Sequence, residues 1–179
     1  MTTPLNRSEY DALLDDLQAD RAQLQISRNV ARRFFTHVSP GNIHSVTGQY
    51  VVIQHLLVIA SLVAGVLCAA ASLLVVYLEF DTMAFLAVPL TGILWTVIAG
   101  FSNELGGTWD TLALYLASLV LIWFLPTGYI LPVFFFVTGL LLYRAAHLLA
   151  AYFLKKLVIG SFEAFEMLEQ HITVVGHAD

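Results

Sequence analysis

The sequence predicts an all-α integral membrane protein, with four transmembrane helices and a cytoplasmic amphipathic helix at each end. Three observations lead to this fold class. Of the 179 residues, 59% are apolar and 12% are charged, and the mean hydropathy is +0.79. The apolar residues fall into four long runs, and Lys and Arg are absent from the three loops between the runs. A typical soluble domain is about one-quarter charged, so lipid must act as the solvent for much of this surface.

Residues 1–40 are expected to form a cytoplasmic amphipathic helix from Thr2 to Val38. Apolar residues recur there at intervals of three, four or seven, and aspartates precede arginines, an order that complements the helix dipole. Two interpretations of its second half are open. The sequence Arg32-Arg33-Phe34-Phe35 suits an interfacial helix lying on the membrane. Alternatively, this half is a solvated helix that links to the first span.

The membrane bundle is expected over residues 41–157, with spans at about 51–78, 83–101, 111–125 and 129–157. About 20 helical residues cross the ~30 Å hydrocarbon layer. The first and last spans are therefore long enough to tilt or protrude, while the third is short. Pro89 should kink the second span, and Asp110 is a plausible N-cap for the third.

The tail, residues 158–179, is expected to be a second cytoplasmic amphipathic helix. Apolar residues share one face of it, and glutamates lie off that face. If the last span continues unbroken through Gly160, one helix would reach Thr173. The acidic tail could then pair with the basic half of the N-terminal helix, with apolar faces supplying the contact because exposed charge pairs contribute little.

The basic residues set the expected orientation. Five of the eight lie before the first span, and the other three, Arg144, Lys155 and Lys156, lie toward the end of the last span. The positive-inside rule then places both termini in the cytoplasm. We expect the plasma membrane, which in bacteria is the inner membrane.

The first span carries small residues in two parallel rows. Small residues four positions apart let helix backbones approach closely in lipid. We therefore expect a helix-packing surface, whose partner is either another span or another copy. The rows contain Ala60, Ala64, Cys68 and Ser72, and Ser61, Gly65 and Ala69.

A polar seam is predicted on the last span, where Arg144, His147 and Lys155 fall on one helical face. A charge inside the membrane suggests a functional site. Arg144 lies 15 residues past Tyr129, or roughly 22 Å along a helix, so its side chain could also snorkel to the interface. Both interpretations stay open. His55 and His147 together permit a b-type haem hypothesis, which we do not favour because His55 falls at or outside the interface.

Four carboxylates lie at the edges of the predicted loops. They could form rings around a pore in an oligomer, or they could be ordinary solvated loop charges. These residues are Glu79, Asp81, Glu104 and Asp110.

The sequence shows no motif of a known catalytic or metal site, and the lone Cys68 permits neither an intrachain disulfide nor a thiolate cluster. We expect no enzyme activity, no metal and no cofactor. The net charge of −5 argues against a nucleic-acid partner. Most tryptophans and several tyrosines lie near predicted span boundaries, which is typical of the aromatic belt.

The function predicted from these features is that of a non-catalytic, multi-span membrane subunit that assembles with itself or with a partner through helix packing. The alternative is a homo-oligomeric ion channel or pore with a gate near Arg144 and His147.

Overall fold

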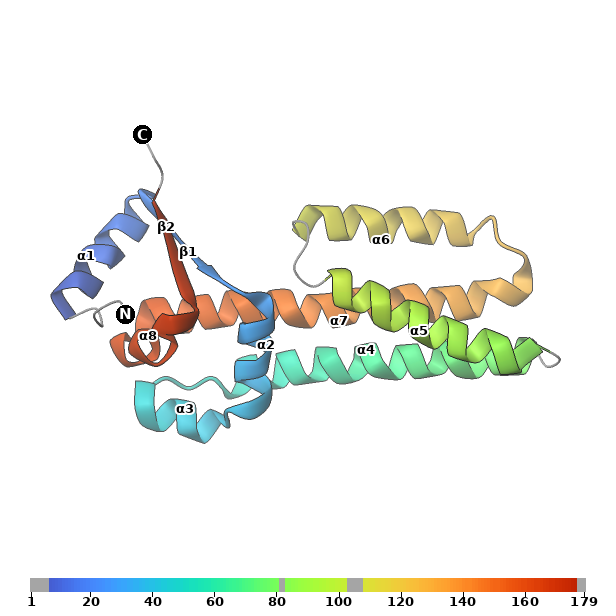
Figure 1. The fold of residues 1–179 in the computed structure, drawn as a ribbon, viewed down its shortest axis with the longest axis horizontal. Coiled ribbons are helices and arrows are strands. Elements are labelled where there is room, and N and C mark those ends of the chain that lie inside the picture. Colours follow the sequence, from blue (N-terminus) through green and yellow to red (C-terminus); the bar gives the residue numbers. More distant parts are fainter. Residues whose placement is uncertain (1–6, 81–82, 103–107, 177–179) are drawn as a thin grey trace. The chain divides into compact units, whose positions relative to one another are not determined.

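A computed structural model describes residues 7–80, 83–102 and 108–176 (Figure 1). The described chain is mostly helical, as the sequence predicts. It divides into two compact units. Unit 1 combines the two ends of the chain, residues 1–56 and 149–179, and unit 2 contains residues 57–148.

The first element of unit 1 is α1, Arg7–Gln18, which ends far earlier than expected. Asp20 adopts φ 56°, the left-handed conformation. The N–H of Arg21 then donates to the carbonyl of Asp16 at 2.9 Å, and the N–H of Asp20 donates to that of Leu17 at 3.4 Å. This is the Schellman arrangement that closes a helix end. The prediction of one helix over residues 2–38 is therefore wrong.

A two-stranded antiparallel sheet follows, which the all-α prediction did not contain. Strand β1, Ala22–Ile26, pairs with β2, Ile172–Gly176, with Leu24 opposite Val174. Ala22 and Leu24 are buried while Gln23 and Gln25 are exposed. The alternation gives the sheet one apolar face, and α1 contacts β1. The two ends of the chain are thus joined by strands rather than by a pair of helices.

The tail is not one continuous helix. Helix α7, Thr127–Gly160, ends where Ser161 turns to an extended backbone, and the Ser161 hydroxyl accepts a hydrogen bond from the N–H of Ala164. Ser161 therefore caps a new helix, α8, Phe162–Leu168. A 3₁₀ turn, Glu169–His171, leads into β2. The tail is rich in β-branched residues at Ile172–Val175, a composition that favours a strand.

The core of unit 1 forms around α2, Arg28–His37, and α3, Pro40–Thr47. Phe35 is fully buried and its ring packs near those of His55 and Phe153. Phe34 is also buried. Both phenylalanines therefore belong to the core of unit 1, a role that neither interpretation of this half included.

Unit 2 is made of helices. It contains most of α4, Val52–Glu79, all of α5, Ala84–Ser102, and α6, Thr108–Ile122, and the first part of α7. Helices α4 and α7 are long and apolar enough to cross a membrane. Helix α5 is shorter and is apolar over Ala84–Gly100. Because α6 begins at Thr108, Asp110 lies inside its first turn and is not the N-cap that we expected.

Candidate functional site

Two helices of unit 2 approach each other closely where Gly65 of α4 faces α7. A Cβ added at Gly65 would lie 2.9 Å from the backbone nitrogen of Tyr143 and 3.1 Å from the carbonyl oxygen of Gly139. A Cβ at Gly139 would lie 3.0 Å from the carbonyl oxygen of Gly65. Such distances leave no room for a side chain on either helix. We call Gly65 and Gly139, with their backbone neighbours, the glycine crossing.

A hydrogen bond ties the same two helices together at a second point. The hydroxyl of Ser72, which is 1% exposed, donates to the carbonyl oxygen of Pro132 at 2.9 Å. Gly65 and Ser72 belong to different predicted small-residue rows, and both are buried. Of the other row members, Ser61, Ala64, Cys68 and Ala69 are half-buried and Ala60 is exposed. The α7 side of this contact was not predicted, because Gly139 stands alone among bulky residues with no small residue four positions away.

The two predicted seam residues in unit 2 follow Tyr143, whose backbone faces Gly65, by one and four positions on α7. His147 is 0% exposed, and its Nδ1–H donates to the carbonyl oxygen of Tyr143 at 2.9 Å. The carbonyl can only accept, so this bond fixes the tautomer. Arg144, the next residue after Tyr143, is half-buried. The third seam residue, Lys155, is half-buried in unit 1.

An aromatic row extends from the same point. The ring centroid of Tyr143 lies 4.9 Å from that of His147 and 5.4 Å from that of Trp95. The Nε1 atom of Trp95 lies 3.2 Å from the position of a Cβ on Gly139. Trp95 therefore packs in the helix contact and is not part of the boundary belt expected from the sequence.

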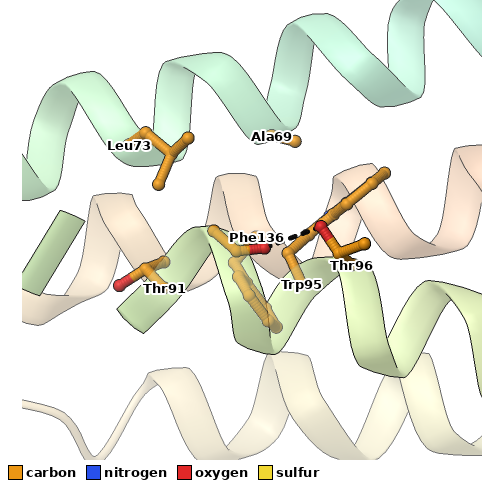
Figure 2. Close-up of a pocket in the computed structure, with 7 residues that line it drawn as sticks. Ala69, Leu73, Thr91, Trp95, Thr96 and Phe136 are labelled. Carbon is orange, nitrogen blue, oxygen red and sulfur yellow. Dashed lines mark hydrogen bonds between the residues drawn. The ribbon is translucent and has the colours of Figure 1, made fainter. Parts of the chain in front are cut away.

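A cavity of about 250 Å³ lies beside Trp95 (Figure 2). Ala69 and Leu73 of α4, Thr91 and Thr96 of α5, and Phe136 of α7 face it. The Thr91 hydroxyl donates to the carbonyl of Ala87, and the Thr96 hydroxyl donates to that of Gly92, both at 2.8 Å. The hydroxyls of both threonines are therefore satisfied within α5. Apart from these hydroxyls and the indole Nε1 of Trp95, which finds no hydrogen-bond partner among the described residues, the side chains that line the cavity are apolar.

The predicted carboxylates do not form a described cluster. Glu79 is exposed at the end of α4. Asp81 and Glu104 lie outside the described residues, and for Asp110 only the backbone in α6 is described. Among the residues described, no group of three or more His, Cys, Asp or Glu side chains could hold a metal ion. The two histidines of the haem hypothesis fall in separate units, His55 in unit 1 and His147 in unit 2.

In unit 1, the side chain of Tyr10 makes contacts with two other helices. Its hydroxyl donates to the carbonyl oxygens of Val158 at 2.8 Å and Ile159 at 3.0 Å. These carbonyls belong to the last turn of α7, which has no intrahelical donors for them. The ring also packs against Phe162 and Phe165 of α8, at centroid distances of 5.4 Å and 5.3 Å. Tyr10 therefore binds α1 to the α7–α8 corner.

Two pKa shifts accompany this corner. Burial raises the pKa of Tyr10, and the carboxylates of Asp11 and Glu163 raise it further. The pKa of Glu163 is lowered by its hydrogen bond with a backbone N–H and by the Ser161 hydroxyl, which donates to its carboxylate at 2.8 Å. Both shifts favour the protonation states present at neutral pH, so they describe a structural corner rather than a reactive group.

Comparison of this chain with protein-family models, with curated proteins and with solved structures finds no match. Its function must therefore be inferred from its own residues and geometry.

Proposed function

We propose that this protein is a non-catalytic membrane subunit whose unit 2 crosses the bilayer four times. One observation carries the proposal, namely the inverted distribution of side chains in unit 2. Large apolar side chains point outward, among them Leu67 at 63%, Phe85 at 88% and Leu90 at 68% exposed. Gly65, Ser72 and His147 are buried instead. A soluble monomer rarely exposes contiguous apolar surface of this extent, whereas lipid solvates it.

The lengths of the helices support four crossings to different degrees. Helices α4 and α7, with 28 and 34 residues, exceed what a bilayer needs. Helix α5 has 19 residues and is close to sufficient, while α6 has 15 residues and covers roughly 22 Å. We propose that the bilayer thins locally at α6. Both ends of the chain, and hence unit 1, would lie in the cytoplasm, beneath the plasma or bacterial inner membrane.

The subunit interpretation is preferred over the pore. His147, proposed to gate the pore, is fully buried, and its Nδ1–H donates to the carbonyl of Tyr143 in its own helix. A buried side chain held in this way is not placed to line an open pore. The side of α4 that carries Ala60, Ala64 and Cys68 retains partial exposure. We propose that it packs against a further helix, contributed by a second copy or by a partner subunit.

Labelling of single cysteines with a membrane-impermeant maleimide tests the topology, in a Cys68→Ala background. Trp123→Cys replaces an 86% exposed side chain between α6 and α7, and Trp109→Cys replaces an 81% exposed one at the start of α6. Four crossings with cytoplasmic termini predict labelling of position 123 from outside intact cells and protection of position 109. Labelling of both positions would mean that only α4 and α7 cross, and the four-span proposal would fail.

Assembly is tested with the native cysteine. If a second copy packs on this side of α4, oxidation in native membranes should give a Cys68-linked dimer. The Cys68→Ala, Leu67→Cys variant serves as the control, because residue 67 is 63% exposed on a neighbouring face. Equal crosslinking at both positions would indicate random collision. A monomer on native mass spectrometry would point to a different partner.

A further inference from the structure

A larger cavity, of about 510 Å³, lies in unit 2 between α4, α5 and α7. Val76 and Phe80 line it from the end of α4, Ala87 and Leu90 from α5, and Tyr129 and Val133 from α7. It shares Thr91 and Phe136 with the smaller cavity. The volume falls within the ~300–1,000 Å³ range of sites that hold small molecules.

The chemistry of the lining selects hydrocarbon as its occupant. Three of the lining residues carry a hydroxyl. The Ser72 hydroxyl donates to the carbonyl oxygen of Pro132, and the Thr91 hydroxyl donates to that of Ala87. The remaining hydroxyl belongs to Tyr129, which is 45% exposed. Inside the cavity, a polar ligand would therefore lose its hydrogen bonds to water without replacement, at substantial cost.

The size of the cavity argues against a helix as its occupant. A helix about 10 Å across fills roughly 400 Å³ per turn, so the cavity holds little more than a single turn. A flexible acyl chain does not need room for several helical turns. Because chains of this kind surround unit 2 in a bilayer, one of them recovers the dispersion contacts that an empty cavity would lose.

One end of the cavity is marked by polar and charged groups. The rings of Phe80 and Tyr129 pack there with centroids 5.0 Å apart. The carboxylate of Glu79 lies 3.6 Å from the Cβ position of the adjacent Gly128, and Glu79 is exposed. The one Lys or Arg between residues 57 and 148 is Arg144, roughly 22 Å further along α7 than Tyr129. This end therefore attracts a cation and repels an anion.

We propose that the cavity holds one acyl chain of a phospholipid whose headgroup carries an ammonium group, with the ammonium near Glu79. The inference rests on the proposed location of unit 2 in a bilayer. It goes beyond that proposal because it assigns a bound lipid and a headgroup preference to named residues. Anionic phospholipids should bind less well, since their headgroups add negative charge beside the Glu79 carboxylate.

Electron paramagnetic resonance on the full chain in nanodiscs tests the inference. Spin-labelled phosphatidylethanolamine and phosphatidylglycerol are compared as probes at equal concentration. Wild-type protein should immobilise a phosphatidylethanolamine chain beyond the fast-exchanging boundary lipid. The preference over phosphatidylglycerol should be about fivefold, the ratio given by ~1 kcal/mol per charge near a membrane surface. Equal immobilisation of both lipids would overturn the headgroup assignment.

Two substitutions separate the cavity from the headgroup site. Ala87→Trp fills the cavity and should remove the immobilised chain, while Ile93→Trp, at a 63% exposed position of the same helix, should leave it in place. Glu79→Gln should abolish the fivefold preference, and Glu79→Asp should keep it. If Ala87→Trp does not fold, the Glu79 pair still decides the assignment.

Failure of the inference is distinguishable from failure of the proposed function. A chain that does not enter nanodiscs contradicts the membrane location itself. A chain that enters them, labels at position 123 as a four-span protein and immobilises no lipid contradicts the cavity assignment alone. Loss of the immobilised chain in Ile93→Trp as well as in Ala87→Trp would also overturn the assignment.

Discussion

Unit 1 and unit 2 place their side chains in opposite ways. Unit 1 buries large apolar residues, such as Phe35, Leu154 and Phe165, and most of its charged side chains are exposed or half-buried. Unit 2 exposes most of its large apolar side chains and buries Gly65, Ser72 and His147. If unit 2 lies in lipid, as proposed, each unit presents to its solvent the side chains which that solvent tolerates.

With unit 2 in a bilayer, as proposed, two kinds of free energy would stabilise the one chain. In water, burial of apolar area stabilises a fold by roughly 25 cal/mol per Å². In lipid this term vanishes between helices, and close packing and hydrogen bonds remain. The stability of unit 1 should therefore fall when a buried side chain is made smaller. The stability of unit 2 should fall when a buried small residue is made larger.

The largest expected effect is from Phe35→Ala in unit 1. Phe35 is 0% exposed, and removal of a buried phenylalanine ring costs about 3–5 kcal/mol. Phe85→Ala in unit 2 makes the same chemical change at an 88% exposed position, where about 0.5 kcal/mol or less is expected. Hydrogen exchange in each unit measures both. Equal loss of protection in the two variants would contradict the comparison.

Enlarging a residue should reverse this pattern. In Gly65→Leu the new side chain meets the backbone of Tyr143 and Gly139, atoms that yield only if α4 and α7 separate. We expect about 1–3 kcal/mol or more of destabilisation. Gly100→Leu is the matched control, because no atom lies within 4 Å of a Cβ at that helical glycine. Thermal unfolding in detergent should separate them, and a Gly65→Leu variant as stable as Gly100→Leu would mean that the glycine crossing is not a stabilising contact.

Unit 2 is the more predictable from sequence. Hydrophobic run length alone predicts the bounds of α4 closely, Val52–Glu79 against an expected 51–78. The helix that packs against the small residues of α4 could not be predicted from the sequence. Small residues on α4 indicate close packing, but Gly139 of α7 has no repeat around it, so the pairing of the two glycines needed the three-dimensional structure.

Unit 1 was predicted poorly for a physical reason. Its helix α1 stops at a left-handed Asp20, where sequence rules look for glycine. The paired residues of β1 and β2 lie 146 positions apart at Ile26 and Ile172 and 154 positions apart at Ala22 and Gly176. Neither strand is stable without the other. The local β-propensity of each segment therefore underestimates its tendency to form a strand. The Tyr10 hydroxyl and its acceptor on Val158 are 148 residues apart. A contact at this separation cannot be predicted from the periodicity of apolar residues along the sequence.

A smaller effect is expected when the Tyr10 hydroxyl is removed. Tyr10→Phe keeps the ring contacts with Phe162 and Phe165 but leaves the carbonyls of Val158 and Ile159 without this donor. A hydrogen bond contributes about 0.5–1.5 kcal/mol, so we expect ~1–2 kcal/mol. Amide exchange should quicken in α8 and the last turn of α7. The same loss in unit 2 would show that the two units do not respond independently.

The smallest expected effect is a pH dependence confined to unit 1. The pKa of Glu163 is lowered in the folded protein by its backbone and Ser161 hydrogen bonds. Its ionised form therefore stabilises unit 1 at neutral pH, and this contribution is lost as the pH falls from the ordinary value of 4.5 through the lowered pKa. Glu163→Gln should reduce the acid sensitivity of exchange in α8, whereas Glu166→Gln, at an exposed position of the same helix, should not. If both substitutions act alike, net charge rather than the Ser161 contact is responsible. The protection of unit 2, measured as the ratio of intrinsic to observed exchange rates, should stay constant over this range, because the contacts described at the glycine crossing include no carboxylate.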